Sequence, residues 1–352
     1  MWRERMADHP YATLPAERYW RKAVAGVPPF ALDPTRPEAF QLTRHEKIAT
    51  AGSCFAQEVA RVLQEAGYTY HVTEAPPARA DRTRQEAETR FSARYGNVYT
   101  TRHLLQLFQR SVGTFKPALV AWRREDGRYV DPFRPSMEPD GFATEEEVAA
   151  ARDFHLACVR ELWRTLDTLV FTFGLTEGWI DRQDGAALPV PPGVMGGEWD
   201  RDRYGPVNGT VASMTEDMLA FLDGLRELNP ASRVVLTVSP IPIIATVEDR
   251  HVLVSNSYTK SALRVVADEV CRARPNVFYF PSYEVATAPS TMARYFGENL
   301  RSINEAGLRH VMRLFLRHAE GAAPVRHAAP LDLQQQASQV GQVICDEEAL
   351  DP

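Results

Sequence analysis

Two uninterrupted apolar stretches constrain the fold more than any other feature of this sequence. DTLVFTFGL at 167–175 and RVVLTVSP at 233–240 lack the alternation expected of a strand with one face in water. Such runs are typical of strands buried on both faces, as in parallel sheets that are covered by helices. HEKIATAGSC and NVFYFPSY supply two more strands, and YTYHV is a candidate fifth. The sequence therefore predicts an α/β fold with a parallel sheet between two helical layers.

Segments with helical spacing separate these strands. FAQEVARVLQEAGY follows the first strand, and a capped helix begins at Thr144. Further helices are expected near 213–228, 257–273 and 304–318. Stretches rich in breakers predict an irregular excursion at 73–94, a loop or small hairpin at 116–142 and a Gly- and Pro-rich loop at 182–209.

The expected organisation is one large domain with two appendages. Residues 1–44, rich in Pro and Arg with isolated aromatics, predict an N-terminal arm packed on the body. Residues 45–318 form the α/β domain, and 319–352 a loosely held C-terminal tail. A chain of 352 residues is long enough to build a sizeable core in this way.

Composition argues against several classes of function. The net charge of −6 and the scattered Lys and Arg give no basic surface for nucleic acid. No apolar run is long enough to span a membrane, and the first residues lack a signal-peptide core, so we expect a cytoplasmic protein. Four cysteines without a CxxC pair make a metal site or a disulfide framework improbable, and no cofactor is expected.

The turn Gly52-Ser53-Cys54 is the first candidate site. It follows a strand and precedes a helix, where glycine permits a sharp turn and the helix start offers N–H donors. That setting lowers the pKa of a thiol in general and can hold an oxyanion. The alternative is a plain turn, with Ser53 as helix cap and Cys54 as a small core residue. In a parallel sheet, ligands bind beyond the carboxyl ends of the strands, where this turn lies.

The segments AGSCFAQEVA, YGNVYTTRHLLQL, TFGLTEGW, LTVSPIPI and SNSYTKSALR follow one another in this order. Together they resemble the GSCFA-domain family, a bacterial group related to the SGNH/GDSL hydrolases, over roughly residues 18–315. Five ordered blocks are far more specific than one motif. The resemblance implies a flavodoxin-like, three-layer α/β/α fold with a cleft for esterase or acyl-transfer chemistry.

The resemblance also implies roles for single residues. Cys54 takes the place of the SGNH nucleophile, and a shift of one residue would give that role to Ser53. We favour Cys54, because a thiolate at a helix start needs less help from a base than a hydroxyl does. Gly96 and Asn97 resemble the second SGNH block, which contributes to the oxyanion hole, although a simple Asn-containing turn is the alternative.

The GLTEGW segment takes the place of the third SGNH block. Thr176 stands where the family of hydrolases has an asparagine, and a hydroxyl is a poorer fixed donor. Glu177 is a candidate to orient a partner or bind substrate, and Trp179 a candidate apolar or sugar-stacking wall. A strand-end loop with a capping Glu is the structural alternative.

The usual base is missing from the sequence. SGNH enzymes carry Asp-x-x-His before the last helix, but this chain has Asn299 and Ser302 at those two places. His251, which follows the SPIPI strand, is the best substitute. His310 and His103 are weaker candidates.

Two basic residues and the expected ligands complete the hypothesis. Lys260 and Arg264, one helical turn apart, are candidates for a cationic edge that binds a carboxylate or phosphate, unless they form a solvated helix face. The predicted function is an acyl-handling enzyme, an esterase or acyltransferase, with a small-molecule or carbohydrate substrate and acyl-CoA as one candidate donor. The alternative is a non-catalytic ligand-binding module on the same scaffold.

Overall fold

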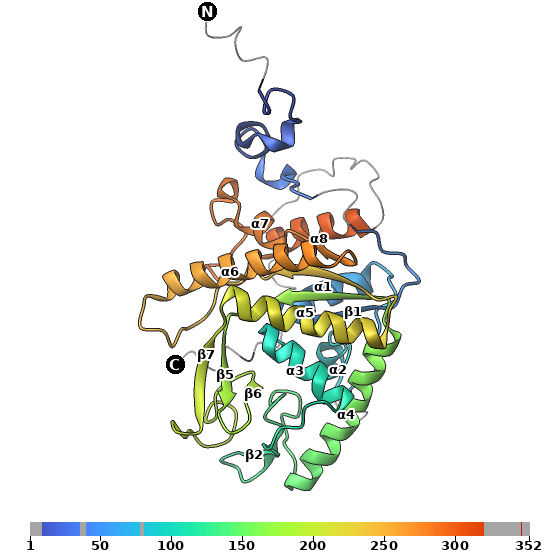
Figure 1. Cartoon of the computed structure of the whole chain (residues 1–352), viewed down its shortest axis with the longest axis vertical. Coiled ribbons are helices and arrows are strands. Elements are labelled where there is room, and N and C mark those ends of the chain that lie inside the picture. Colours follow the sequence, from blue (N-terminus) through green and yellow to red (C-terminus); the bar gives the residue numbers. More distant parts are fainter. Residues whose placement is uncertain (1–8, 36–39, 78–80, 320–345, 347–352) are drawn as a thin grey trace, which may run out of the picture.

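A four-stranded parallel sheet forms the centre of the molecule (Figure 1). The computed structural model describes residues 9–35, 40–77, 81–319 and 346. The sheet has the order β1-β4-β8-β9, and its strands are β1 (Ile48–Gly52), β4 (Thr168–Phe173), β8 (Arg233–Val238) and β9 (Val277–Tyr279). In this register Gly52 pairs with Thr172. The last residue of β1 therefore lies beside the carboxyl end of β4.

The candidate fifth strand is present as a single bridge. Tyr70 pairs in parallel with Ile48 at the open edge of β1. Including it, the chain visits the sheet in the spatial order 2-1-3-4-5, which is the flavodoxin-like arrangement. The predicted fold class is confirmed by this parallel sheet and the helices that flank it.

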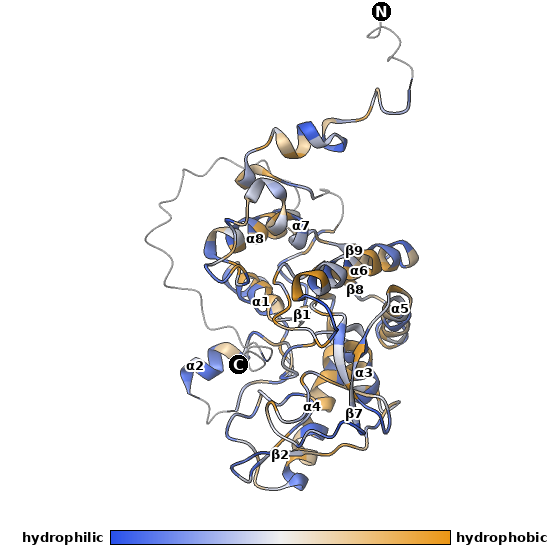
Figure 2. Cartoon of the chain, turned by 90° about the vertical axis from the view of Figure 1, so that its left-hand side faces the viewer, coloured by the Kyte–Doolittle hydropathy of each residue, from blue (hydrophilic) through white to orange (hydrophobic). Residues whose placement is uncertain are grey.

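Helices cover both faces of the sheet. Alternate residues of each strand point to opposite faces, so neighbouring residues pack against different helices. Leu169 and Phe171 belong to an apolar cluster with helices α3, α4, α5 and α6, whereas Val170 belongs to a second cluster with α1, α7 and α8. Figure 2 shows α1 and α8 on one side of the strands and α5 on the other. Both faces of the strands are thus dry, which explains their unbroken apolar sequences.

Most helices lie where the sequence predicts them. Thr144 caps α4 by accepting the backbone N–H of Glu147, as the TEEE pattern indicates. The helix α6 begins five residues earlier than expected, because His251 caps its first turn. The helices are α1 (Phe55–Glu65), α2 (Arg82–Glu88), α3 (Thr101–Val112), α4 (Glu145–Thr165), α5 (Val211–Leu228), α6 (Val252–Ala273), α7 (Ser282–Thr287) and α8 (Glu305–Ala319).

Two segments contain more structure than the sequence predicts, and a third contains the hairpin that the sequence allows. The supposed loop at 182–209 contributes to an antiparallel sheet of β5 (Glu177–Asp181), β6 (Ala186–Leu188) and β7 (Tyr204–Asn208). The helix α2 forms inside the supposed excursion at 73–94. The expected hairpin within 116–142 is present as β2 (Trp122–Arg123) and β3 (Tyr129–Val130). These elements are too short for periodicity to reveal, and the strands β2, β3, β5, β6 and β7 contribute to one small apolar cluster.

The N-terminal residues contact the body only in part. Short helical turns occur at Ala16–Arg18, Arg21–Ala25 and Pro29–Ala31. The side chains of Tyr11, Trp20 and Phe30 are exposed, whereas Phe40 and Leu42 are buried against the α8 side of the sheet. This arm lies beyond α7 and α8 in Figure 1. The expected C-terminal tail falls outside the described residues except for its first residue, Ala319, and Asp346.

None of the described helices has the length and apolar character needed to cross a bilayer.

Candidate functional site

The Gly52-Ser53-Cys54 turn is fixed by its contact with β4. Gly52 has φ of +137°, and a Cβ there would lie 2.7 Å from the backbone nitrogen of Thr172. No other residue fits this close approach of two strands. The Ser53 N–H then donates to the Thr172 carbonyl at 3.1 Å. The chain passes directly from β1 into α1, with Cys54 as the N-cap residue.

Both side chains at this turn are buried, with 4% of Ser53 and 4% of Cys54 exposed. The place of this turn beyond a strand end suggests a side chain that a ligand can reach, but neither the thiol nor the hydroxyl is open to solvent in the described structure. The Ser53 Oγ has no hydrogen-bond partner among the described residues. Gly174 lies against it, since a Cβ on that glycine would be 2.9 Å from the Ser53 Cβ. An unsatisfied buried hydroxyl is rare and is a feature of functional sites as well as of strained packing.

Asn97, from the second predicted block, lies beside the turn. The N–H of the next residue, Val98, donates to the Gly52 carbonyl at 2.8 Å. The Asn97 Oδ1 accepts from Gln57 Nε2 of α1 at 3.0 Å, which orients its amide. Its Nδ2 therefore points outward as a donor, and it binds Asp346 Oδ2 at 3.2 Å. Gly96 supplies the left-handed turn, with φ of +71°.

Tyr99 is a member of the site that sequence reasoning missed. Its carbonyl accepts from the N–H groups of Gly174 and Leu175, at 3.2 and 3.0 Å. Its hydroxyl accepts from the backbone N–H of Asp346 at 3.1 Å. Tyr99 thus joins the second and third blocks. The YGNVYTT motif contained it, but no family role directed attention to its side chain.

The third block contacts α6 through buried polar groups. The Thr176 Oγ1 lies 3.0 Å from the Thr259 Oγ1, and the Lys260 Nζ donates to the Gly174 carbonyl at 3.1 Å. Lys260 is almost fully buried. The expectation of a shared cationic edge with Arg264 is wrong, because Arg264 instead pairs with Glu284 at 2.8 Å. Lys260 and Arg264 lie one turn apart on α6, but the first is buried and the second is partly exposed.

Glu177 and Trp179 bind other parts of the chain. Glu177 accepts from Thr246 Oγ1 at 2.6 Å and from the Val247 N–H at 3.1 Å, so it holds the connection between β8 and α6. Trp179 meets Trp199 edge to face, with ring centroids 5.3 Å apart. It packs against the cluster of the small antiparallel sheet. No recorded contact joins either residue to the Gly52-Ser53-Cys54 turn among the described residues.

Two of the three candidate histidines make side-chain hydrogen bonds elsewhere, and the buried Nδ1 of His103 has no hydrogen-bond partner among the described residues. His251 is exposed, and its Nδ1 accepts from the Leu253 N–H as the cap of α6. His310 lies between Tyr295 and the Leu32 carbonyl, and burial lowers its pKa to about 4. Burial lowers the pKa of His103 to about 3. Within the described part of the chain, none of the three is hydrogen-bonded to Ser53.

The positions of the missing Asp and His form a closed turn. The Asn299 Nδ2 donates to the Ser302 Oγ at 3.0 Å, and the Asn299 Oδ1 accepts from the N–H groups of Arg301 and Ser302. Leu300 between them has φ of +52° and is exposed. The two side chains satisfy each other rather than reaching toward a nucleophile.

A buried group of charges supports the loop that carries Asn97. We call it the charge cluster; its members are Glu74, Arg94, Asp131, Arg134, Arg152 and His155, all at most 9% exposed. Glu74 Oε2 accepts from the Arg94 backbone and contacts His155 Nδ1. Although burial acts in the opposite direction, His155 and Arg134 lower the pKa of Glu74 to about 2. Burial, reinforced by Arg134, lowers the pKa of His155 to about 4, so a neutral imidazole binds a carboxylate.

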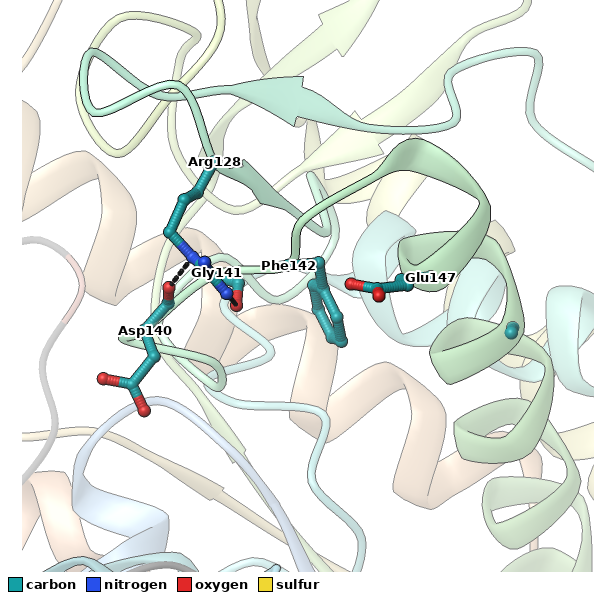
Figure 3. Close-up of a pocket in the computed structure, with 6 residues that line it drawn as sticks. Arg128, Asp140, Gly141, Phe142 and Glu147 are labelled. Atoms are coloured by element: carbon teal, nitrogen blue, oxygen red, sulfur yellow. Dashed lines mark hydrogen bonds between the residues drawn. The ribbon is translucent and has the colours of Figure 1, made fainter.

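A surface pocket lies in a different region, between the residue that precedes β3 and the first turns of α4 (Figure 3). Its lining contains none of the predicted site residues. The Arg128 guanidinium in it donates to the carbonyls of Asp140 and Gly141, so its charge is directed at backbone. The pocket is lined by Arg128, Asp140, Gly141, Phe142, Glu147 and Ala150.

The turn therefore holds a buried thiol and a buried hydroxyl, and Gly174, whose carbonyl binds the Lys260 amine, packs against Ser53. Comparisons with known proteins bear on the same residues. No curated protein matches the chain. The model of the GSCFA family matches residues 47–315, which include the turn, Asn97, Gly174 and Lys260. Because this match covers most of its length, the chain belongs to the GSCFA family.

Proposed function

We propose that the chain is an acyl-handling enzyme, an esterase or acyltransferase, that forms an acyl intermediate on Cys54. Ser53 is the alternative nucleophile. The observation that carries the proposal is the buried Ser53 hydroxyl without a hydrogen-bond partner among the described residues, next to a thiol at a helix start. Family membership supports the idea through the likeness of GSCFA motifs to SGNH hydrolases.

In this mechanism the Cys54 thiolate attacks the carbonyl carbon of an ester or thioester. The carbonyl electrons move to the oxygen, and the Asn97 amide and N–H groups at the start of α1 stabilise the resulting oxyanion. Collapse expels an alkoxide or thiolate, which takes the proton that the base removed from the Cys54 thiol. Water or an acceptor hydroxyl then releases the acyl group, so that hydrolysis and transfer share the first half-reaction.

Lys260 is the basic group that the fold brings next to this turn. Its amine contacts the carbonyl of Gly174, and Gly174 in turn packs on Ser53. We assign Lys260 the role of proton acceptor that the sequence offered to His251, whose Nδ1 is engaged in capping α6.

Acyl capture provides the test. The protein is incubated with p-nitrophenyl acetate or an acyl-CoA, and its intact mass is measured. We expect one added acyl group that is lost in Cys54→Ala. Cys158→Ala and Cys271→Ala are matched controls that retain it, because burial raises the pKa of both thiols, to about 11 for Cys271. Lys260→Met should slow acylation without preventing folding. An adduct that persists in both Cys54→Ala and Ser53→Ala would refute the assignment.

A non-catalytic ligand-binding module is the second candidate. The closed turn of Asn299 and Ser302 favours it, since the place of the usual base is occupied by two side chains that bind each other. If no adduct forms with either acyl donor in the unmodified chain, this second function is preferred.

A further inference from the structure

Asp346 lies in the candidate site although it is distant in sequence from every other member. Its side chain and backbone are buried, with 4% exposed. The carboxylate accepts from Asn97 Nδ2 at 3.2 Å, and its backbone N–H donates to the Tyr99 hydroxyl at 3.1 Å. The chain has thus placed one of its own acidic residues against the amide that would bind an oxyanion.

Asn97 and Tyr99 match two features of an acidic residue at once. The Asn97 amide supplies a donor to a carboxylate oxygen, and the Tyr99 oxygen supplies an acceptor to an amide N–H. Both groups are held in place independently of Asp346. Gln57 orients the Asn97 amide, and the N–H groups of Gly174 and Leu175 hold the Tyr99 backbone. A preorganised pair of this kind selects a ligand by geometry as well as charge.

The contact with Asp346 is incomplete. Its second carboxylate oxygen, Oδ1, is buried without a hydrogen bond of normal geometry among the described residues, although the Ser136 side chain interacts with the carboxylate. Burial raises the pKa of Asp346, so its charged form is held in the site at a cost. An internal ligand with one unsatisfied oxygen is easier to displace than a fully bonded one.

We propose that Asn97 and Tyr99 form a receptor for acylated acidic amino acids, such as an acidic residue of a peptide, and that Asp346 occupies it in the resting chain. The proposal concerns binding alone, and it stands whether or not Cys54 becomes acylated. A competing ligand would need the same two groups in the same relation, an amide N–H next to a carboxylate.

Binding of N-acetyl-L-aspartate amide to the full-length chain tests this proposal. Isothermal titration calorimetry should show that Asp346→Ala binds the probe about tenfold more tightly than the unmodified chain. Removing an internal competitor that fills about nine-tenths of the sites has this effect on apparent affinity. Asp126→Ala, which removes an exposed surface carboxylate, is the matched control and should leave affinity unchanged.

Two further comparisons separate recognition from simple loss of the tail contact. Asn97→Leu in the Asp346→Ala background should abolish binding, with the fold checked by circular dichroism. Acetate, which lacks the N–H, and N-acetyl-L-alanine amide, which lacks the carboxylate, should bind at least tenfold more weakly than the probe. Equal affinity of both chains, retained binding in the Asn97 variant, equal affinity of acetate, or no binding at all would each overturn the proposal.

Discussion

The turn at Gly52-Ser53-Cys54 and the charge cluster both contact the segment 94–98 that contains Asn97, and both are buried. They differ in how their polar groups are bonded. In the cluster, Asp131 accepts from Arg152 at 2.7 Å and from Arg134 at 3.3 Å, and Glu74 binds Arg134 and His155. At the turn, Ser53 Oγ and Thr172 Oγ1 are buried without hydrogen-bond partners among the described residues.

This difference indicates that the buried polar groups of the two regions have different roles, structural in the cluster and functional at the turn. Desolvated charges persist in a fold only when their partners remain in place, so the cluster fixes the position of the loop that carries Asn97. Unsatisfied polar atoms reduce stability, and they are retained where a ligand or a reacting group completes the hydrogen bonding. The cluster should therefore govern stability, and the turn should govern binding and chemistry.

The largest expected effect is the loss of Asp131. Asp131→Ala leaves Arg152 buried without the anion it pairs with among the described residues and leaves Arg134 with Glu74 alone, and breaking such a buried pair typically costs about 3–5 kcal/mol of unfolding free energy. Urea denaturation measures the change. Asp126→Ala, which breaks the exposed pair with Arg124, should cost less than about 1 kcal/mol. Similar losses for the two variants would remove the structural role given to the cluster.

Acidification should weaken the cluster in two steps. The pKa of His155 is lowered from 6.5 to about 4, so its contribution is complete above pH 6.5 and is lost as the pH falls toward 4. The pKa of Glu74 is lowered from 4.5 to about 2, so its contribution declines below pH 4.5. The loss from His155 is on the order of 3 kcal/mol.

Denaturation at several pH values between 7 and 4 measures this decline. His155→Gln, which keeps a donor near Glu74 but does not titrate, should flatten the dependence over that interval. An unchanged slope in the variant would show that other groups cause the acid sensitivity.

A smaller effect is expected from closing the space beside Ser53. Gly174→Ala introduces a Cβ 2.9 Å from the Ser53 Cβ and 3.3 Å from the Tyr99 carbonyl, and such overpacking typically costs about 1–3 kcal/mol. The variant should also lose acyl capture, because the turn must shift. Gly297→Ala is a suitable control, since its new Cβ meets only ordinary contacts at 3.7 Å. Retained acylation in Gly174→Ala would show that the turn does not depend on this packing.

The smallest stability change should come from Ser53 itself. Ser53→Ala removes a hydroxyl that has no partner among the described residues, so the unfolding free energy should change by less than about 1 kcal/mol. Ser92→Ala is the matched buried serine: its Oγ accepts from the Thr50 N–H at 3.0 Å, and its loss should cost about 1–3 kcal/mol. If Ser53→Ala is the more damaging change, the contrast between the two regions is invalid.

Much of the central architecture was predictable because its causes are local. The apolar run at 168–173 indicates a strand buried on both faces, and the Thr144 cap marks the start of α4. The Gly-Ser-Cys turn was recognisable because only glycine permits the required backbone angle. By contrast, the strands β5–β7 were missed, since three short antiparallel strands lack a sequence period long enough to detect.

The sequence by itself determined the parallel sheet, the helices around it and the Gly-Ser-Cys turn, because periodicity, capping and glycine act between near neighbours. Only the tertiary structure decided that Lys260 points inward while Arg264 pairs with Glu284, and that Asp346 reaches Asn97 across 249 positions. Such contacts depend on which helix faces and distant segments the fold brings together. Their energies come from burial and from polar pairing that no local pattern records.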